Sequence, residues 1–334
     1  MDNGRLWHVD AFATAPFAGN PAAVLLLDRE PDDELGARVG AELNQPATAV
    51  AWPGDRPGWF GLRWFTDTRE LELCGHGTLA AARVLLDSGA GVDGRLCFET
   101  MAGTLEARAV GEWVQLRLPS LPPQPLIDAA TADGEPGAAA DGEAVLGEAV
   151  RQLLDVPVSE IMRNDLDVVA VLSCPADVLR AAPDLAALSR LPVRGLVITA
   201  AGDGGGRNGS GPDAAVPGAE APDGAASDGA ASDGAAPGAA LGGAADFVSR
   251  FFSPATGVGE DAVTGSAHCA LGPYWIGKLG RQPLLGRQLS ARGGVVQVAG
   301  DGDCVLLAGP ALVLSEGSWR LPVGSHPGQP VASG

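Results

Sequence analysis

Two short segments of the chain concentrate side chains that could move a proton or hold an anion. The first, Cys74 to Thr78, precedes an apolar, alanine-rich run from Leu79 to Leu86. The second, Glu260 to Cys269, lies near the far end of the chain. Each places a small, glycine-containing turn directly before a helical pattern. We expect the two turns to face one another across a cleft and to form the active site.

A helix N-terminus presents unpaired backbone N–H groups and the positive end of the helix dipole, which suit a carboxylate or a developing oxyanion. Two such ends could clamp an acidic substrate and stabilise an enolate-like intermediate. We therefore expect contacts to the substrate from Cys74, Gly75, Gly77, Thr264 and Gly265. The predicted chemistry is proton abstraction next to an activated carbon.

Three polar residues of these turns are candidates for the proton transfer. His76 lies where the helix dipole favours its neutral form, so it could accept a proton or donate a hydrogen bond, or it could only satisfy local backbone groups. Asp261 could serve as a base or anchor a substrate amine, or it could be a capping residue. Ser266 could donate to the substrate or merely cap the second helix.

The five cysteines indicate free thiols in a reducing compartment. They are widely spaced, with no Cys-x-x-Cys pair and no zinc-ligand spacing. Cys74 could be a thiolate, because a helix terminus lowers the pKa of a thiol, or it could be a buried packing residue. His268 and Cys269 fall inside the second helix and are expected to pack. We expect no metal and no nucleotide or other cofactor.

The charge of the chain bounds its partners. A formal net charge of −19 makes nucleic acid and anionic membranes poor partners. Much of the acidity lies in two low-complexity stretches: 121–142 has four acids and no base, and 202–245 has six acids and one arginine. The chain has no apolar run of about 18 residues and no secretion signal at its start, so we expect a cytoplasmic protein.

The same two stretches define the expected domain organisation. We expect an N-terminal domain at 1–120, a flexible linker at 121–142, a C-terminal domain at 143–322 and a tail at 323–334. Within the second domain, 202–245 has almost no large apolar residue, so burial cannot offset the entropy of ordering it. We expect this insert to be disordered.

The two halves share a weak internal repeat. Trp64 to Thr66 precedes the first turn, and Phe251 to Ser253 precedes the second; a helix and short strands follow in each case. The first helix is predicted at Thr78 to Ser88 and the second at Ser266 to Leu279. Aligning the two turns superposes Cys74 on Thr264 and His76 on Ser266. This pattern predicts a duplicated α/β unit.

At this point the residues resemble a known family, the PhzF-like (phenazine biosynthesis) proteins of the diaminopimelate epimerase-like fold. The matching pieces cover most of the chain outside the two low-complexity stretches: residues 8–12, 16–24, 62–66, 73–78, 259–269 and 288–294. The resemblance implies an α/β (α+β mixed) fold of two pseudo-symmetric domains, each a curved mixed sheet around a central helix. It also implies a cofactor-free isomerase or epimerase of a biosynthetic process, often a homodimer.

The resemblance maps three polar family positions onto His76, Asp261 and Ser266. One matching piece contains Gly19 and Asn20, which we also expect at the substrate. The family's acid/base glutamate lies in a run resembling Asn-x-Ser-Glu-Thr, whereas residues 44–48 read Asn-Gln-Pro-Ala-Thr, so Ala47 occupies the glutamate position. The two-cysteine mechanism of related epimerases is also missing, because Thr264 is the counterpart of Cys74.

Three hypotheses follow from this departure. In the first, the protein is a cofactor-independent isomerase for a small carboxylated metabolite, with Asp261 and His76 moving the proton. In the second, it is a catalytically impaired small-molecule binding protein, because a methyl group at Ala47 cannot transfer a proton. In the third, a reaction at Cys74 replaces the glutamate chemistry.

Overall fold

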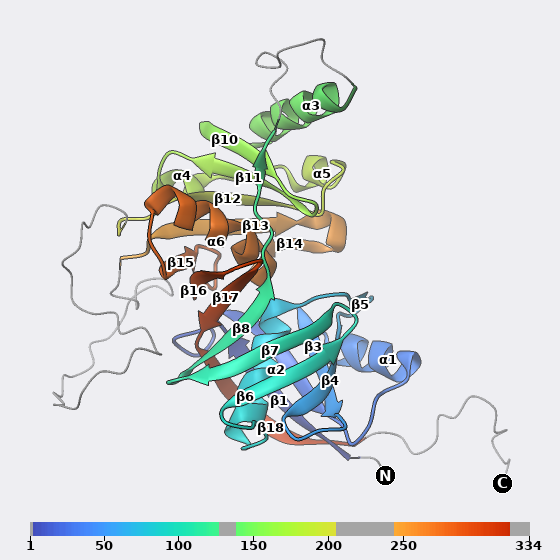
Figure 1. The fold of residues 1–334 in the computed structure, drawn as a ribbon. Helices are drawn as coiled ribbons and strands as arrows, with labels where there is room; N and C mark the ends of the chain where they lie inside the picture. The colour runs from blue at the N-terminus through green and yellow to red at the C-terminus, as the bar shows by residue number, and fades with distance from the viewer. Residues whose placement is uncertain (1–2, 127–137, 205–243, 321–334) are drawn as a thin grey trace, which may run out of the picture.

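The computed structural model describes residues 3–126, 138–204 and 244–320. Two units of similar construction are stacked, as Figure 1 shows, with β8 and β17 at the junction. The first unit consists of β1 (Asn3–Ala11), β2 (Asn20–Leu26), α1 (Asp33–Leu43), β3 (Ala47–Pro53), β4 (Trp59–Phe65), β5 (Glu70–Leu71), α2 (Gly75–Asp87), β6 (Arg95–Thr100), β7 (Gly103–Val110) and β8 (Trp113–Pro119).

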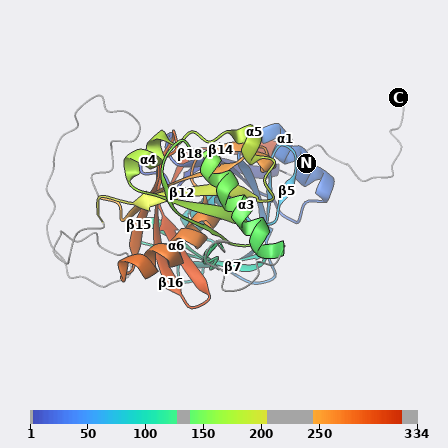
Figure 2. The same ribbon diagram turned by 90° about the horizontal axis from the view of Figure 1, so that it is seen from above.

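The second unit repeats this order. It consists of β10 (Val158–Arg163), β11 (Asp167–Leu172), α4 (Pro175–Arg180), α5 (Leu185–Leu188), β12 (Gly195–Ala201), β13 (Phe247–Ser253), the short 3₁₀ helix η1 (Pro254–Thr256), β14 (Val258–Asp261), α6 (Gly265–Leu279), β15 (Leu284–Gln288), β16 (Gly294–Asp301) and β17 (Cys304–Gly309). Helix α3 (Ala138–Leu153) precedes this unit and lies across it in Figure 2.

The strand pairings of the two units correspond one to one. In the first, β1–β2 is antiparallel, β2–β3 parallel, β3–β4 antiparallel, β4–β6 parallel, and β6–β7 and β7–β8 antiparallel. In the second, β10–β11 through β16–β17 follow the same series of directions. The short strands β5 and β14 branch from β4 and β13 in the same way. The duplication predicted from the weak repeat is confirmed, and so is the predicted fold class.

The strand that follows each unit pairs with the other unit. After β8, β9 (Gln124–Pro125) pairs with β10, the first strand of the second unit. After β17, β18 (Ala311–Arg320) pairs along the whole of β1, the first strand of the first unit. β8 and β17 also pair with each other. These exchanges fix the two units relative to one another, because each sheet is completed by a strand from the other half of the chain.

The central helix of each unit is buried by its sheet. Helix α2 buries its residues from His76 to Ala82, together with Val84 and Leu85, and contacts strands on several sides. Helix α6 is likewise buried from Ala267 to Gly272 and contacts β15, β16 and β17. Apolar residues therefore surround most of each helix, as expected for a helix enclosed by protein.

A proline in the middle of α6 helps to anchor the connector between the units. Pro273 has no N–H, so it cannot donate to the carbonyl of Cys269, four residues earlier. The backbone N–H of Leu121, in the connector, donates to that carbonyl at 3.1 Å. A carbonyl that the helix leaves unpaired thus holds the chain as it passes from the first unit to the second.

The two predicted central helices are present as α2 and α6, whereas several other elements were not predicted. β10 was not predicted. β15 (Leu284–Gln288) was not predicted either. Gly286 in the centre of β15 weakens the strand pattern, but a Cβ there would lie 2.4 Å from the Phe247 ring, so close packing requires a glycine.

The predicted domain boundaries stay a prediction. Much of the linker, most of the 202–245 insert and all of the 323–334 tail lie outside the described residues. Within the described ranges, none of the helices combines the length and the apolar character that a membrane crossing requires.

Candidate active site between two helix N-termini

The N-termini of α2 and α6 meet at a pair of glycines. A Cβ built on Gly75 would lie 3.1 Å from the Cα of Gly265, and a Cβ on Gly265 would lie 3.1 Å from the Cα of Gly75. Any side chain at either position would push the helices apart, so this approach explains the two glycines. The expectation that the two turns face one another agrees with this geometry.

A cavity of about 130 Å³ opens beside this contact. Its wall contains seven of the predicted site residues: Cys74, Gly75, His76, Asp261, Thr264, Gly265 and Ser266. The remaining three, Gly19, Asn20 and Gly77, are not in the wall. Their places in the structure, described next, show what each contacts.

Asn20 contacts Asp261 instead of the cavity. The Asn20 side chain is fully buried, and its Nδ2 donates to Asp261 Oδ1 at 2.7 Å and to the carbonyl of Val263 at 2.8 Å. Gly19 adopts a φ of +66°, and its carbonyl accepts from Arg292 Nε at 2.8 Å. Gly77 packs against the Trp64 ring, which leaves no room for a Cβ. In this structure these three residues support the site from behind its wall.

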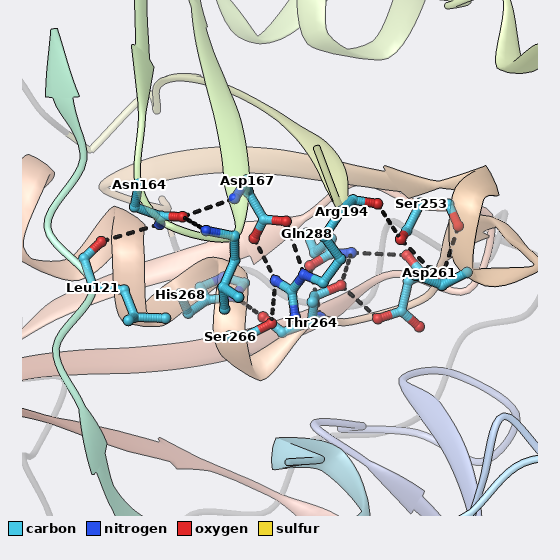
Figure 3. Close-up of polar contacts among 12 residues, drawn as sticks. Leu121, Asn164, Asp167, Arg194, Ser253, Asp261, Thr264, Ser266, His268 and Gln288 are labelled. Atoms are coloured by element: carbon cyan, nitrogen blue, oxygen red, sulfur yellow. Dashed lines mark hydrogen bonds and ion pairs between the residues drawn. The ribbon is translucent and has the colours of Figure 1, made fainter. Parts of the chain in front are cut away.

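The Asp261 carboxylate is fixed by two donors. Besides Asn20, Thr264 Oγ1 donates to Asp261 Oδ2 at 2.5 Å. Gln288 then holds the loop, since its Nε2 donates to the carbonyl of Asp261 at 2.8 Å and its Oε1 accepts from the Thr264 N–H at 2.9 Å. Figure 3 shows Asp261, Thr264 and Gln288 gathered at the start of α6. Each carboxylate oxygen keeps a lone pair that can accept a proton.

Ser266 is held by an arginine that the sequence analysis missed. Arg194 Nη2 donates to Ser266 Oγ at 2.9 Å, and its Nε donates to Asp167 Oδ1 at 2.9 Å. A second contact joins Arg194 Nη2 to Asp167 Oδ2, so the pair is bidentate (Figure 3). Because Ser266 Oγ accepts from Arg194, its own proton can point toward the cavity.

The only sequence signal for Arg194 was weak. It directly precedes the strand that begins at Gly195, and its partner Asp167 begins the neighbouring strand, 27 residues earlier. Burial raises the pKa of Asp167, and the hydrogen bonds from Arg194 oppose that rise. No motif links the two residues, so only the pairing of β11 with β12 brings them together.

His76 is buried in the cavity wall. Burial lowers the pKa of the His76 imidazole, while the negative charge of Asp261 opposes that shift. The ring is therefore neutral at physiological pH, as the helix position predicted. Cys74 Sγ lies 3.5 Å from His76 Nδ1.

The structure favours the packing interpretation of Cys74 over the thiolate interpretation. The side chain is buried, and this burial raises its pKa to about 12, because the loss of water outweighs the helix N–H groups of Gly77 and His76. Desolvation disfavours the charged form of an acid, and here it is the larger effect. Neither Cys74 nor Thr264 caps its helix with its own side chain, and Asp261 accepts from the Thr264 hydroxyl within the turn.

The run that carries the family's glutamate contributes no acid to the site. Ala47 is fully buried at the start of β3 and pairs with Ala22 of β2, and its neighbour Pro46 is the residue that lines the cavity. Among the described residues of the wall, Asp261 is the sole carboxylate. No cluster of three or more potential metal-ligating side chains occurs in the described part of the chain.

The comparisons with known proteins agree with this architecture. A family model described as phenazine biosynthesis-like protein, PhzC-PhzF, matches residues 9–209 and 226–317. The chain belongs to the PhzC-PhzF family. A Pseudomonas aeruginosa relative named as an uncharacterized isomerase is 35% identical, with 94% of this chain and 97% of the relative covered.

Solved structures of the family have the same fold. The crystal structure of a PhzF-family protein from Enterococcus faecalis superposes with a TM-score of 0.72 at 28% identity, covering 96% of this chain and 100% of that one. A hydroxyproline epimerase from Agrobacterium vitis, solved with bound trans-4-hydroxy-L-proline, has a TM-score of 0.50 at 12% identity, with 95% and 93% covered. At 12% identity, the similarity to the hydroxyproline epimerase shows only that the two proteins share a fold. As a member of this family, the chain is an isomerase-type enzyme.

Proposed function

We propose that the protein is a cofactor-independent isomerase or epimerase that moves a proton on a small carboxylated metabolite. The observation that supports this most directly is the hydrogen-bonded Asp261 carboxylate in one cavity with the neutral His76 and two helix N-termini. A base, a neutral imidazole and donors for an oxyanion are the groups that abstraction next to a carboxylate requires.

The proposed reaction begins with the ionised Asp261. It accepts the proton from the carbon next to the substrate carboxylate, and the electrons of that C–H bond move onto the carboxylate oxygens. The N–H groups at the start of α2 and α6, with the Ser266 hydroxyl, stabilise the added negative charge. The proton then returns to the carbon skeleton from Asp261 or through His76, which completes the isomerisation without a net change in charge.

Hydrogen exchange tests this proposal. The protein is incubated with candidate carboxylic acids in D₂O, and C–H exchange is followed by NMR. Exchange that His76→Ala and Asp261→Asn abolish supports the reaction. Exchange that persists in both variants, or that is absent for every acid that binds, contradicts it.

A second candidate is a small-molecule binding protein on the same scaffold. Ala47 favours it, because the position that holds the family's glutamate carries a buried methyl group. Repeated binding of carboxylic acids without exchange would support this alternative. The small carboxylated substrate is a prediction from the two helix N-termini, and the homodimeric state and a biosynthetic role are predictions from the resemblance.

A further inference from the structure

Three residues with charged side chains line the cavity, and two of these side chains bind other residues of the protein. Arg194 is paired with Asp167, whose side chain is fully buried, so the protein itself balances this positive charge. Asp261 accepts from Asn20 and Thr264. The third is Arg69, which lies in the turn between β4 and β5.

Arg69 is an unpaired cation at the cavity. Its residue is exposed, and its guanidinium makes no hydrogen bond or ion pair with any residue in the described ranges. The adjacent acid, Glu70, is bound instead by Arg63, at 2.7 Å from Nε and 2.6 Å from Nη2. In a chain of net charge −19, an arginine without a carboxylate partner among the described residues is available to an anion from solution.

The backbone that carries Arg69 is held in place. Thr66 Oγ1 accepts from the Arg69 N–H at 3.1 Å, and the Thr66 N–H donates to the Arg69 carbonyl at 2.8 Å. Thr66 also lines the cavity, as does Pro46 from the run where the family has its glutamate. This part of the wall therefore offers a positive group and no acid, because Ala47 supplies none.

We propose that Arg69 binds a second acidic group of the substrate, so that the substrate is a small dicarboxylate. This rests on the proposed function, in which the carboxylate at the reacting carbon lies against the helix N-termini at Gly75 and Gly265. A second carboxylate reaching Arg69 would meet a planar guanidinium that can bind it through two hydrogen bonds. Arg69 is thus a residue that determines substrate specificity.

The test measures binding by calorimetry at low salt, using butyrate and succinate, which differ by one carboxylate. We expect succinate to bind about tenfold more tightly than butyrate to the unmodified protein. Arg69→Gln should reduce this preference to less than about twofold while butyrate affinity is unchanged, and Arg69→Lys should keep part of it. Raising the salt concentration should narrow the preference, because Arg69 is exposed.

Arg56→Gln is the matched control. Arg56 is another exposed arginine, which stacks on the Trp59 ring and does not line the cavity. It should retain the preference for succinate. Equal binding of the two acids by the unmodified protein, an intact preference in Arg69→Gln, or an equal loss of affinity for both acids would overturn the proposal. Tighter binding of 3-phosphonopropionate than of succinate would overturn the dicarboxylate in favour of a phosphoryl group.

The outcome separates this proposal from the proposed reaction, because the binding assay needs no turnover. A succinate preference that depends on Arg69 without any C–H exchange would contradict the isomerase and leave the role of Arg69 intact. C–H exchange on a dicarboxylate that Arg69→Gln leaves unchanged in both affinity and rate would contradict the role of Arg69 alone.

Discussion

The two helix-starting turns have the same backbone and different surroundings. Cys74 and Thr264 both precede their helix in extended conformation without a side-chain cap. In each, the residue four positions later donates its side chain to the carbonyl of the first: Thr78 Oγ1 at 2.7 Å to Cys74, and His268 Nδ1 at 2.8 Å to Thr264. The two turns therefore share the backbone conformation and also this side-chain hydrogen bond to the first carbonyl.

The difference between the turns lies in polarity. The first turn buries Cys74 and His76, whose polar atoms meet only in long S···N contacts of 3.5 and 3.9 Å, and desolvation keeps both side chains neutral. The second turn fixes a carboxylate and a hydroxyl through Asn20, Gln288 and Arg194. The same backbone arrangement thus provides neutral side chains on one side of the cavity and a charged, hydrogen-bonded carboxylate on the other. The comparison can be tested from both sides.

The largest effect on turnover is expected in the second turn, at Asp261. Asp261→Asn keeps the shape and removes the base, so turnover should fall by roughly 100-fold or more. The measurement is the initial rate of C–H exchange or product formation at saturating substrate. Asp301→Asn, which changes an exposed acid paired with Arg117, serves as the control and should not alter the rate. Full turnover in Asp261→Asn would remove this residue from the mechanism.

The next effect is on stability and concerns His268, which occupies in the second helix the position that Thr78 has in the first. Burial lowers the pKa of His268 to about 4, against an ordinary value of 6.5. The unfolded chain therefore binds this proton more readily, so His268 lowers the stability of the fold as the pH falls from about 6.5 toward 4. Between pH 7 and pH 5 we expect a loss on the order of 2 kcal/mol in the free energy of unfolding from this group.

The variant His268→Thr places a threonine where the first helix has Thr78. It keeps a side-chain donor for the Thr264 carbonyl and removes the titrating ring. Its stability at pH 7 should be lower because the side chain is smaller. The informative quantity is the slope: chemical denaturation at several pH values should show a weaker loss toward pH 5 than in the unmodified protein. An identical slope in both proteins would mean that His268 is not the source.

A smaller effect is expected at Ser266. Its hydroxyl accepts from Arg194 and can donate to the substrate, so Ser266→Ala should lower turnover by about tenfold. Ser290→Ala is a suitable control, because that hydroxyl donates to the carbonyl of Ala262 and is not in the cavity wall. If the two variants behave alike, Ser266 has only a structural role.

The smallest effect on turnover is expected in the first turn, at Cys74. Because burial raises the pKa of Cys74 to about 12, its thiol is protonated across the physiological range and is a poor nucleophile. Cys74→Ser should change turnover by less than about threefold, measured together with the rate of thiol alkylation, which should be slow. A large loss of activity would revive the hypothesis of cysteine chemistry at this position.

Much of this arrangement could be predicted from residues close in sequence. The two glycine turns, the helices that follow them and the repeat were all visible, because glycine positions and apolar periodicity are local signals. The long apolar runs after Gly75 and Gly265 also indicated buried helices. The behaviour of Cys74 could not be predicted in this way, since its pKa depends on how completely the surrounding strands exclude water.

The sequence by itself determined the fold class and the main proton-handling candidates, since their types and spacing within each turn are properties of a short segment. Only the tertiary structure decided how they are supported. Asn20 lies 241 residues from Asp261, and Arg194 lies 72 residues from Ser266, yet each donates to its partner across a few ångströms. Such contacts depend on strand pairing between distant segments, and hydrogen bonds between distant segments leave no periodic trace in the chain.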